Sequence, residues 1–333
     1  MRLDNEQESA NIQDDRGNGG GMGSAFGGSS SAFGGGGGGG MGGMLIPLLL
    51  NTIGFRGVIV LAVLYFALKM FTGFDLLNVV NGGGGGITMP QTTQVINPGQ
   101  TGNTQLGKVA NGAAAATDPG KRFVAQILNS TDEVWTKVFT DMGKQYEKPV
   151  LVLYSNFDGH TGCGTAQSSM GPFYCPADHK VYIDLAFYQE LKNKLGAPGE
   201  FAQAYVVAHE VGHHVQNLLG IADQVDSARR SASETQANAL SVRTELQADC
   251  FAGIWGQKLG TLTQIQLDNG DVEQALNAAS QIGDDHLQKA ARGYAQPDTF
   301  THGTSAQRVK WFKQGLTAQS INDCNTFNSS NLG

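Results

Sequence analysis

Two histidines and a glutamate stand at a spacing that suits metal binding and water activation, in the segment His209-Glu210-Val211-Gly212-His213. On a helix, residues four apart point to the same side, so both imidazoles can bind one Zn²⁺ through a ring nitrogen. Glu210 follows the first ligand and flanks the metal without binding it, which is where a general base must lie to accept a proton from metal-bound water. The segment therefore predicts a catalytic site with one zinc ion per chain.

A catalytic zinc site usually has a third protein ligand besides an open position for water. The extended pattern with a further histidine fails because Gln216 and Leu219 follow the pair, which excludes metzincins. The next candidates are Glu245 and Asp249, four residues apart on a second predicted helix. We expect Glu245 to be the third ligand and Asp249 to accept a hydrogen bond from a ligand imidazole, with Asp249 as the rival ligand.

Hydrolysis at such a site also needs a donor that stabilises the developing oxyanion. His302, in a loop that contains glycine and threonine, and Tyr182, in a predicted strand before the active helix, are the two candidates. The alternative interpretations are a capping histidine and a half-buried strand tyrosine. His214 is expected to pack beside the site or to support a ligand rather than to bind the metal.

The elements that must position these residues follow from hydrophobic periodicity. Small and apolar residues at 206–208 and 211–212 predict a buried helix around the histidine pair. Two amphipathic helices are predicted after Lys121, with a cap at Ser130 and Thr131 between them. Short buried strands are predicted at Val150–Tyr154 and Val181–Leu185, with a loop between them at Gly159–Met170. The chain from Leu185 onward is predicted to be mostly helical, with breaks at Pro198, Gly220, Gly270 and Pro297. The fold class is α+β, mostly helical, with a small sheet.

Glycine divides the chain, because 29 of its 47 glycines lie in the first 120 residues, where they preclude a packed core. Residues 1–43 are predicted to be a disordered, glycine-rich tail. The apolar segment 44–77 is predicted to be a transmembrane segment whose core is about 57–77, with a membrane-surface helix and a buried soluble helix as alternatives. Residues 78–120 are predicted to be a flexible linker. The zinc domain is then 121–333.

Arg2, Arg16 and Arg56 precede the core of the apolar segment, whereas after Lys69 the next basic residue is Lys108. The positive-inside rule therefore predicts a single-pass protein of the bacterial inner membrane, with a cytoplasmic N-terminus and a periplasmic or other extracytoplasmic zinc domain. The lipid bilayer is the predicted partner of the apolar segment.

The formal net charge of −7 and the lack of a Lys/Arg run exclude a nucleic-acid-binding protein as the first interpretation. No cysteine belongs to a Cys-x-x-Cys pair, which argues against a thiolate zinc site and against a thioredoxin-type motif. Two disulfides are the natural alternative if the zinc domain faces an oxidising compartment.

Four segments together resemble the bacterial neutral zinc metallopeptidase family. They are His209–His214, Glu245–Gly253, Cys163–Cys175 and Phe300–Arg308, and the N-terminal residues Glu8–Gly17 also resemble the start of that family. The resemblance covers nearly the whole chain, with the glycine-rich segments as its loose part.

The resemblance implies a membrane-anchored, gluzincin-like (zincin-like) domain with zinc on His209, His213 and Glu245 and with Glu210 catalytic. It implies a peptide or protein substrate. By analogy with zincins, the strand Val181–Leu185 would be the sheet edge that holds an extended peptide. With the resemblance in hand, we expect disulfides Cys163–Cys175 and Cys250–Cys324, the second of which would hold the C-terminal segment against the helix of the third ligand.

The function predicted from the sequence is hydrolysis of peptide bonds by a zinc-activated water with Glu210 as general base. The alternative is a non-proteolytic zinc-binding scaffold, or binding module, of the cell envelope. A di-iron carboxylate protein needs two Glu-x-x-His motifs, and only Glu210–His213 fits.

Overall fold

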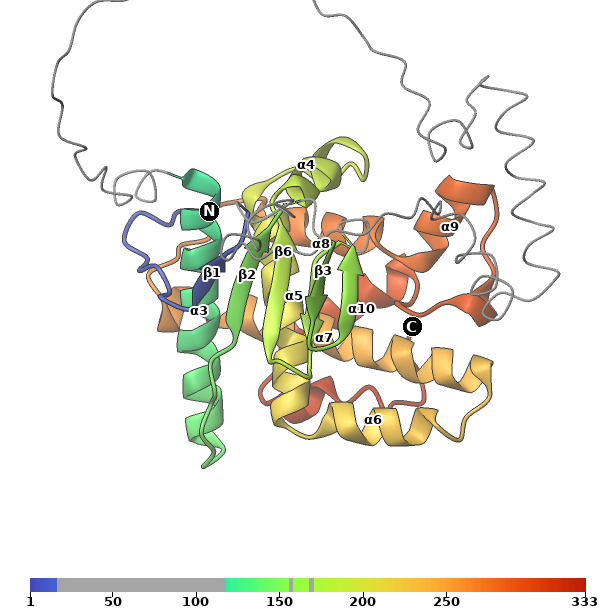
Figure 1. The fold of residues 1–333 in the computed structure, drawn as a ribbon. Coiled ribbons are helices and arrows are strands. Elements are labelled where there is room, and N and C mark those ends of the chain that lie inside the picture. Colours follow the sequence, from blue (N-terminus) through green and yellow to red (C-terminus); the bar gives the residue numbers. More distant parts are fainter. Residues whose placement is uncertain (17–117, 156–157, 168–170) are drawn as a thin grey trace, which may run out of the picture. The chain divides into compact units, whose positions relative to one another are not determined.

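A computed structural model of the chain describes residues 1–16, 118–155, 158–167 and 171–333 (Figure 1). The predicted glycine-rich tail from residue 17 to 43, the predicted transmembrane segment 44–77 and the predicted linker up to residue 117 lie outside the described residues. Among the described residues, no helix is both long and apolar enough to cross a membrane.

The described residues form a small sheet and a larger set of helices, which confirms a mostly helical α+β fold. The strands are β1 (Ile12–Asp14), β2 (Val150–Tyr154), β3 (Asp158–Thr161), β4 (Gly164–Gln167), β5 (Phe173–Cys175) and β6 (Lys180–Asp184). The α-helices are α3 (Pro119–Asp141), α4 (Ala186–Asn193), α5 (Glu200–Leu218), α6 (Ile221–Arg229), α7 (Glu234–Leu262), α8 (Asp271–Gln281), α9 (Asp284–Arg292) and α10 (Ser305–Leu316). Two 3₁₀-helices are η4 (Pro297–Thr299) and η5 (Ile321–Cys324).

The main sheet has the strand order β1-β2-β6-β5. Strands β1, β2 and β6 are parallel, and β5 runs antiparallel to β6. The predicted strand Val150–Tyr154 is confirmed, and the strand predicted at Val181–Leu185 is displaced by one residue. Since β6 has a paired strand on each side, it cannot be the edge that holds a peptide, and that prediction is wrong. The edge on this side is β5.

The two faces of the sheet bury different side chains, because successive residues of a strand point to opposite sides. Val181 and Ile183 of β6 belong to the main core, which they share with helices α3, α5 and α7. Tyr182, between them, packs on the other face in a small cluster with Val152 and Tyr154. The site helix α5 therefore packs against the face that Tyr182 does not share.

The N-terminal residues belong to the zinc domain, so the prediction of a disordered tail is wrong for residues 1–16. Strand β1 pairs with β2, with Ile12 opposite Leu151. Glu6 is buried, and its side chain accepts hydrogen bonds from the side-chain amide of Asn129 and the backbone N–H of Gln264. This strand could not be predicted from the sequence, because three residues carry too little apolar periodicity to be recognised.

Helix α3 is one continuous helix, where the sequence predicted two. The predicted break at Ser130 and Thr131 fails because both hydroxyls donate within the helix, to the carbonyls of Ile127 and Leu128, each three residues earlier. The side chain of Asp118 caps the N-terminus instead, by accepting from two backbone N–H groups of the first turn. The segment predicted as a loop at Gly159–Met170 is also different, because β3 and β4 form an antiparallel hairpin there.

Helices α7 and α10 approach each other closely enough that glycine is required on both. A Cβ added to Gly253 would overlap the carbonyl oxygen of Phe312, and one added to Gly315 would overlap the carbonyl oxygen of Cys250. Gly212 of α5 similarly lies against α7, where an added Cβ would lie 2.9 Å from the carbonyl oxygen of Ala248. These contacts bring α5, α7 and α10 together around the predicted zinc site.

Candidate metal centre

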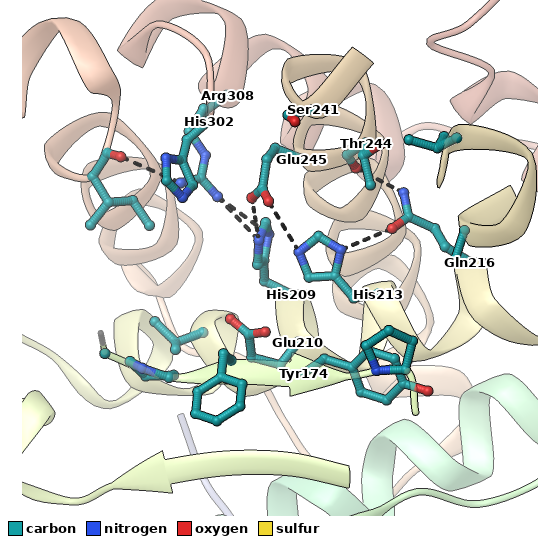
Figure 2. A pocket seen from close by; sticks show the side chains of 18 of the residues that line it. Tyr174, His209, Glu210, His213, Gln216, Ser241, Thr244, Glu245, His302 and Arg308 are labelled. Atoms are coloured by element: carbon teal, nitrogen blue, oxygen red, sulfur yellow. Dashed lines mark hydrogen bonds and ion pairs between the residues drawn. The ribbon is translucent and has the colours of Figure 1, made fainter. Parts of the chain in front are cut away.

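The three predicted zinc ligands lie together between α5 and α7 (Figure 2). One ligand atom from each of His209, His213 and Glu245 can be chosen so that all lie within 4.8 Å of one another. The Nε2 atom of His209 lies 3.1 Å from one carboxylate oxygen of Glu245, and Nε2 of His213 lies 3.5 Å from the other. Both imidazoles thus turn the same nitrogen toward the same carboxylate.

The second nitrogen of each imidazole has its own acceptor on the far side of the ring. Nδ1 of His209 lies 2.8 Å from the carboxylate of Asp249, and Nδ1 of His213 lies 2.9 Å from Oε1 of Gln216. Acceptors at both Nδ1 atoms favour the tautomers that leave Nε2 free for a metal. The donor set of two imidazoles and one carboxylate therefore fits a zinc ion.

Asp249 lies behind a predicted ligand and outside the cluster of the three predicted ligands, as the position of its carboxylate shows. One oxygen contacts His209 and also accepts from the hydroxyl of Tyr205. The guanidinium of Arg308 on α10 donates to both oxygens, at 2.8 and 2.9 Å. Asp249 and Arg308 are both almost completely buried, so each charge depends on the other.

The pKa values of the predicted ligands are shifted because carboxylates and imidazoles lie close together in a buried site. Burial disfavours the cationic form of His209, but Asp249 and Glu245 outweigh it and raise the pKa of His209 to about 9. Burial also disfavours ionised Glu245, yet His213 and His209 hold its pKa well below the usual range. A carboxylate that stays ionised between two imidazoles is suited to a divalent cation in place of the imidazole protons.

Glu210 lines a cleft of about 590 Å³ that also contains the three ligand residues. Its side chain comes from the same helix as the two histidines, and Figure 2 shows its carboxylate on the side of the pair facing the sheet. Phe173 and Tyr174 of the edge strand β5 line the cleft as well. A general base and a sheet edge therefore open onto the same cleft as the predicted metal ligands.

The two predicted oxyanion donors have different outcomes. His302 lines the cleft, with 52% of its side chain exposed. Its ring contacts Asp284, which raises the pKa of His302, and the Asp284 carboxylate also accepts from the backbone N–H of residues 301–303. Tyr182 is absent from the described lining of this cleft, and its hydroxyl donates to Asp178 at 2.7 Å on the other face of the sheet. The prediction for Tyr182 is therefore wrong.

His214 is a packing residue, as one of its two interpretations predicted. It is completely buried, its Nε2 lies 2.7 Å from the carbonyl oxygen of Glu147, and its Nδ1 lies 3.0 Å from the hydroxyl of Tyr174. Because a carbonyl only accepts, Nε2 carries the proton and Nδ1 accepts from the tyrosine. Burial lowers the pKa of His214 to about 4, so its ring stays neutral.

Three residues of the site could not be assigned from the sequence: Tyr205, Gln216 and Arg308. Arg308 and Tyr205 are 103 residues apart and meet only because α10 and α5 both pack against α7. Only the contact of Gln216 with His213 had a signal in the local sequence, because Gln216 follows His213 by three residues and so lies on the same side of the helix.

Both expected disulfides, Cys163–Cys175 and Cys250–Cys324, are present in the structure. The first links the β3–β4 hairpin to β5 (Phe173–Cys175), the edge strand at the cleft. The second ties η5 to α7 one residue after Asp249. Each disulfide therefore holds a segment next to the metal centre.

Comparison with known proteins agrees with the geometry. A sequence model of a family described as "Putative neutral zinc metallopeptidase" matches residues 1–327, which confirms the resemblance seen in the motifs. The Escherichia coli (strain K12) protein named "Uncharacterized protein YpfJ" is 43% identical over 330 residues, which are 99% of this chain and 100% of that protein. The Mycobacterium tuberculosis (strain H37Rv) protein named "Uncharacterized protein Rv2575" is 42% identical over 214 residues, 62% of this chain and 70% of that protein. No solved structure matched the chain.

Proposed function

Since the chain belongs to the family of neutral zinc metallopeptidases, we propose that it is a zinc-dependent peptidase that hydrolyses bonds in peptide or protein substrates. The observation that carries the proposal is the joint position of His209, His213 and Glu245 around one point, with Glu210 beside them in an open cleft. One zinc ion per chain is proposed at that point.

Each residue of the cleft has a separate proposed role in peptide hydrolysis. A bound zinc ion would polarise the scissile carbonyl and acidify water. Glu210 accepts the proton of the attacking water and passes it to the leaving amine. His302, held by Asp284, is the proposed donor to the developing oxyanion. Asp249 keeps Nδ1 of His209 protonated, so that Nε2 of this ring remains a ligand.

The substrate is proposed to bind as an extended strand along β5. This strand is an edge of the sheet and its residues Phe173 and Tyr174 line the cleft. An edge strand offers backbone N–H and C=O groups to an added peptide strand, and the pockets beside it select side chains. In this proposal β5 replaces the predicted strand Val181–Leu185 as the edge that holds the peptide.

Glu210→Gln tests the mechanism, because it removes the base and keeps the shape of the side chain. We expect the variant to retain close to one zinc ion per chain and to lose cleavage of a peptide library. Glu200→Gln, an exposed residue in the first turn of the same helix, is the matched control and should cleave normally. Unchanged cleavage by Glu210→Gln contradicts the mechanism, and full zinc occupancy of the unmodified chain without any cleavage favours the scaffold alternative.

The pairing of β1 with β2 bears on which side of a membrane the described residues lie. A single membrane crossing between residues 16 and 118 would put β1 and β2 on opposite sides of a hydrocarbon layer of about 30 Å. The pairing of these strands within one sheet argues against a cytoplasmic N-terminus combined with an exported zinc domain. We propose instead that residues 1–16 and 118–333 share one extracytoplasmic compartment, which the two disulfides favour.

A further inference from the structure

We infer that the side chains of Gln216 and Gln247 fix the ring tautomer of the zinc ligand His213. They form a hydrogen-bond chain with one direction, which runs from the backbone carbonyl of Cys324 to Nδ1 of His213. The inference rests on the zinc site of the proposed function. It assigns Gln216 and Gln247 as positioning residues for metal binding, and it makes the Cys250–Cys324 disulfide the anchor of the chain.

The contacts are continuous from the disulfide to the ligand. Nδ1 of His213 lies 2.9 Å from Oε1 of Gln216. Nε2 of Gln216 donates to Oε1 of Gln247 at 3.0 Å and to the carbonyl oxygen of Thr244 at 2.8 Å. Nε2 of Gln247 donates to the carbonyl oxygen of Cys324 at 3.0 Å. Gln216 and Gln247 are 1% and 4% exposed, so water does not replace these partners.

The direction of the chain is fixed by its two backbone carbonyls, which can only accept hydrogen bonds. The carbonyl of Cys324 requires the NH₂ group of Gln247, which turns the Gln247 oxygen toward Gln216. The carbonyl of Thr244 likewise requires the NH₂ group of Gln216, which turns the Gln216 oxygen toward His213. The ring of His213 must then carry its proton on Nδ1, and its Nε2 lone pair is left for the metal.

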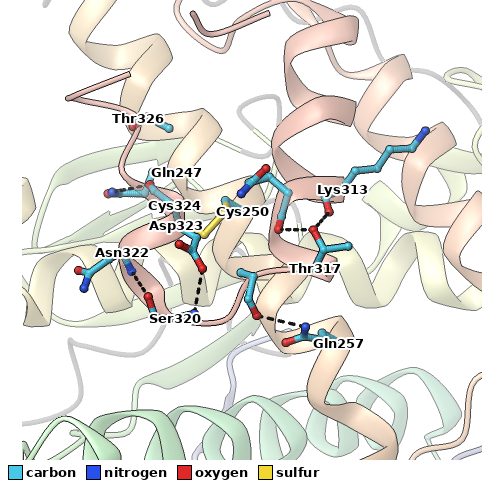
Figure 3. Close-up of a disulfide and its surroundings, with 12 residues drawn as sticks. Gln247, Cys250, Gln257, Lys313, Thr317, Ser320, Asn322, Asp323, Cys324 and Thr326 are labelled. Carbon is cyan, nitrogen blue, oxygen red and sulfur yellow. Dashed lines mark hydrogen bonds between the residues drawn. A yellow bond between two sulfur atoms is a disulfide. The ribbon is translucent and has the colours of Figure 1, made fainter. Parts of the chain in front are cut away.

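The end of the hydrogen-bond chain at Cys324 is held in place by covalent and polar contacts (Figure 3). Cys324 is completely buried and is bonded to Cys250, which lies three residues after Gln247 on α7. Thr326 donates its hydroxyl to the carbonyl of Arg243, and the guanidinium of Arg243 donates back to the carbonyl of Thr326. The accepting carbonyl of Cys324 thus keeps its position relative to the helix that carries Glu245.

The two histidine ligands are therefore held by chemically different acceptors. His209 has the carboxylate of Asp249, whose charge is balanced by Arg308, whereas His213 has a neutral carboxamide. A neutral acceptor fixes the ring without adding a negative charge close to the metal. The carbonyls of Thr244 and Cys324 keep the direction of the two carboxamides, and the disulfide holds the second of these carbonyls in place.

The test compares the zinc dissociation constant of full-length variants by competition with a chelator. Gln216→Leu is expected to raise the zinc Kd by about 10- to 100-fold, the range typical for lost partners of metal ligands. Gln247→Leu is expected to raise it by a smaller factor, because the carbonyl of Thr244 still accepts from the NH₂ group of Gln216. The matched control is Gln257→Leu, because Gln257 also lies on α7 and also donates to a carbonyl of the C-terminal segment, that of Ala318, but does not contact the site. The control should bind zinc like the unmodified chain.

A second measurement separates positioning from general damage to the fold. The ¹⁵N chemical shifts of the His213 ring, recorded on metal-free protein at alkaline pH, report the tautomer directly. We expect a protonated Nδ1 in the unmodified chain and in Gln257→Leu, and a mixture of tautomers in Gln216→Leu. Because Gln216 and Gln247 act in series, the double variant should bind zinc no more weakly than Gln216→Leu alone.

The anchor is tested by the paired substitution Cys250→Ser with Cys324→Ser, which leaves the Cys163–Cys175 disulfide intact. We expect a raised zinc Kd, and little further rise when Gln247→Leu is added. Unchanged zinc Kd values and unchanged His213 shifts in both glutamine variants overturn the inference. Failure of the unmodified chain to bind zinc overturns the proposed function instead, so the two failures are distinguishable.

Discussion

At the scale of single residues, the buried pair of Asp249 and Arg308 connects the metal centre to the stability of the fold. Asp249 contacts a predicted ligand, and Arg308 comes from a helix that supplies no ligand. Removing one partner of a buried pair leaves the other charge without compensation. Loss of either charge of this pair is therefore expected to lower the free energy of unfolding, in addition to any effect on catalysis.

Arg308→Gln should lower the free energy of unfolding by about 3–5 kcal/mol, because the buried Asp249 would lose its guanidinium partner and keep only His209 and Tyr205. Urea unfolding of the zinc-free protein measures this loss. Arg122→Gln is the control, since Arg122 and Glu8 form an ion pair whose side chains are 60% and 55% exposed and whose loss should cost less than about 1 kcal/mol. Equal costs for the two substitutions would contradict the role given to the buried pair.

Asp132 predicts a pH dependence of stability that is separate from the metal. Burial raises the pKa of Asp132 to about 7, and within the described residues its only cationic partner is Lys148 at 3.7 Å. The folded protein thus holds this proton more tightly than the unfolded chain, in which the pKa is about 3.9. Its contribution to stability is present below about pH 4 and is lost as the pH rises toward 7.

Asp132→Asn should abolish that loss, so the variant should gain up to about 4 kcal/mol relative to the unmodified protein between pH 4 and pH 8. Denaturant unfolding of zinc-free protein at several pH values provides the comparison. Asp141→Asn removes an exposed carboxylate at the end of the same helix and is the control, with an expected effect below about 1 kcal/mol. A constant difference for Asp132→Asn would rule out the raised pKa.

Local spacing explains which site residues could be predicted. His209, Glu210 and His213 lie within one and a half turns of a helix, so their types and intervals alone indicate their chemistry. Arg308 has no such interval, because it reaches the site only when α10 packs on α7. Tyr182 failed as a candidate because a strand of unknown register does not reveal which face its side chains take.

At the scale of the elements, the crossing of α7 and α10 positions the centre. Gly253 and Gly315 allow the two backbones to touch, and the crossing places Arg308 beside Asp249. The sequence predicted that this part of the chain is helical, but not that these helices meet. Gly253 and Gly315 gave no sign of this crossing in the sequence, because they are 62 positions apart and form no periodic pattern.

Gly253→Ala should lower the free energy of unfolding by about 1–3 kcal/mol, because the added methyl group forces α10 away from α7. Gly260→Ala lies on the same helix where nothing is within 4 Å of the added carbon, and it should be neutral or stabilise by up to about 1 kcal/mol. Thermal and urea unfolding of both variants measure these changes in the free energy of unfolding. A stabilised Gly253→Ala would show that the helices do not touch as described.

At the scale of the whole molecule, residues 1–16 complete a sheet whose remaining strands begin at residue 150. The composition of the first third of the chain gave no sign of this, because a glycine count over 120 residues conceals a short ordered segment at its start. A chain that starts at residue 121 would lack β1, so enzymatic tests require the full chain.

The shared compartment of the two parts is tested with single cysteines. The four native cysteines all form disulfides, so an introduced thiol has no native background. Asn5→Cys and Lys144→Cys are exposed positions in the two parts. In intact cells both should react with a membrane-impermeant maleimide to the same extent, because β1 and β2 lie in one sheet. Reaction of only one of them would contradict the pairing.

The same strand pairing governs the order in which the protein is completed during synthesis. β1 is made before every other described element, yet its partner β2 emerges more than a hundred residues later, and Glu6 accepts from Gln264, 258 residues further along. Contacts between distant segments form slowly. Until β1 docks, one edge of β2 stays unpaired, and an unpaired edge is a template for other chains. The interval between the synthesis of β2 and the docking of β1 is therefore when the nascent protein is most prone to aggregate.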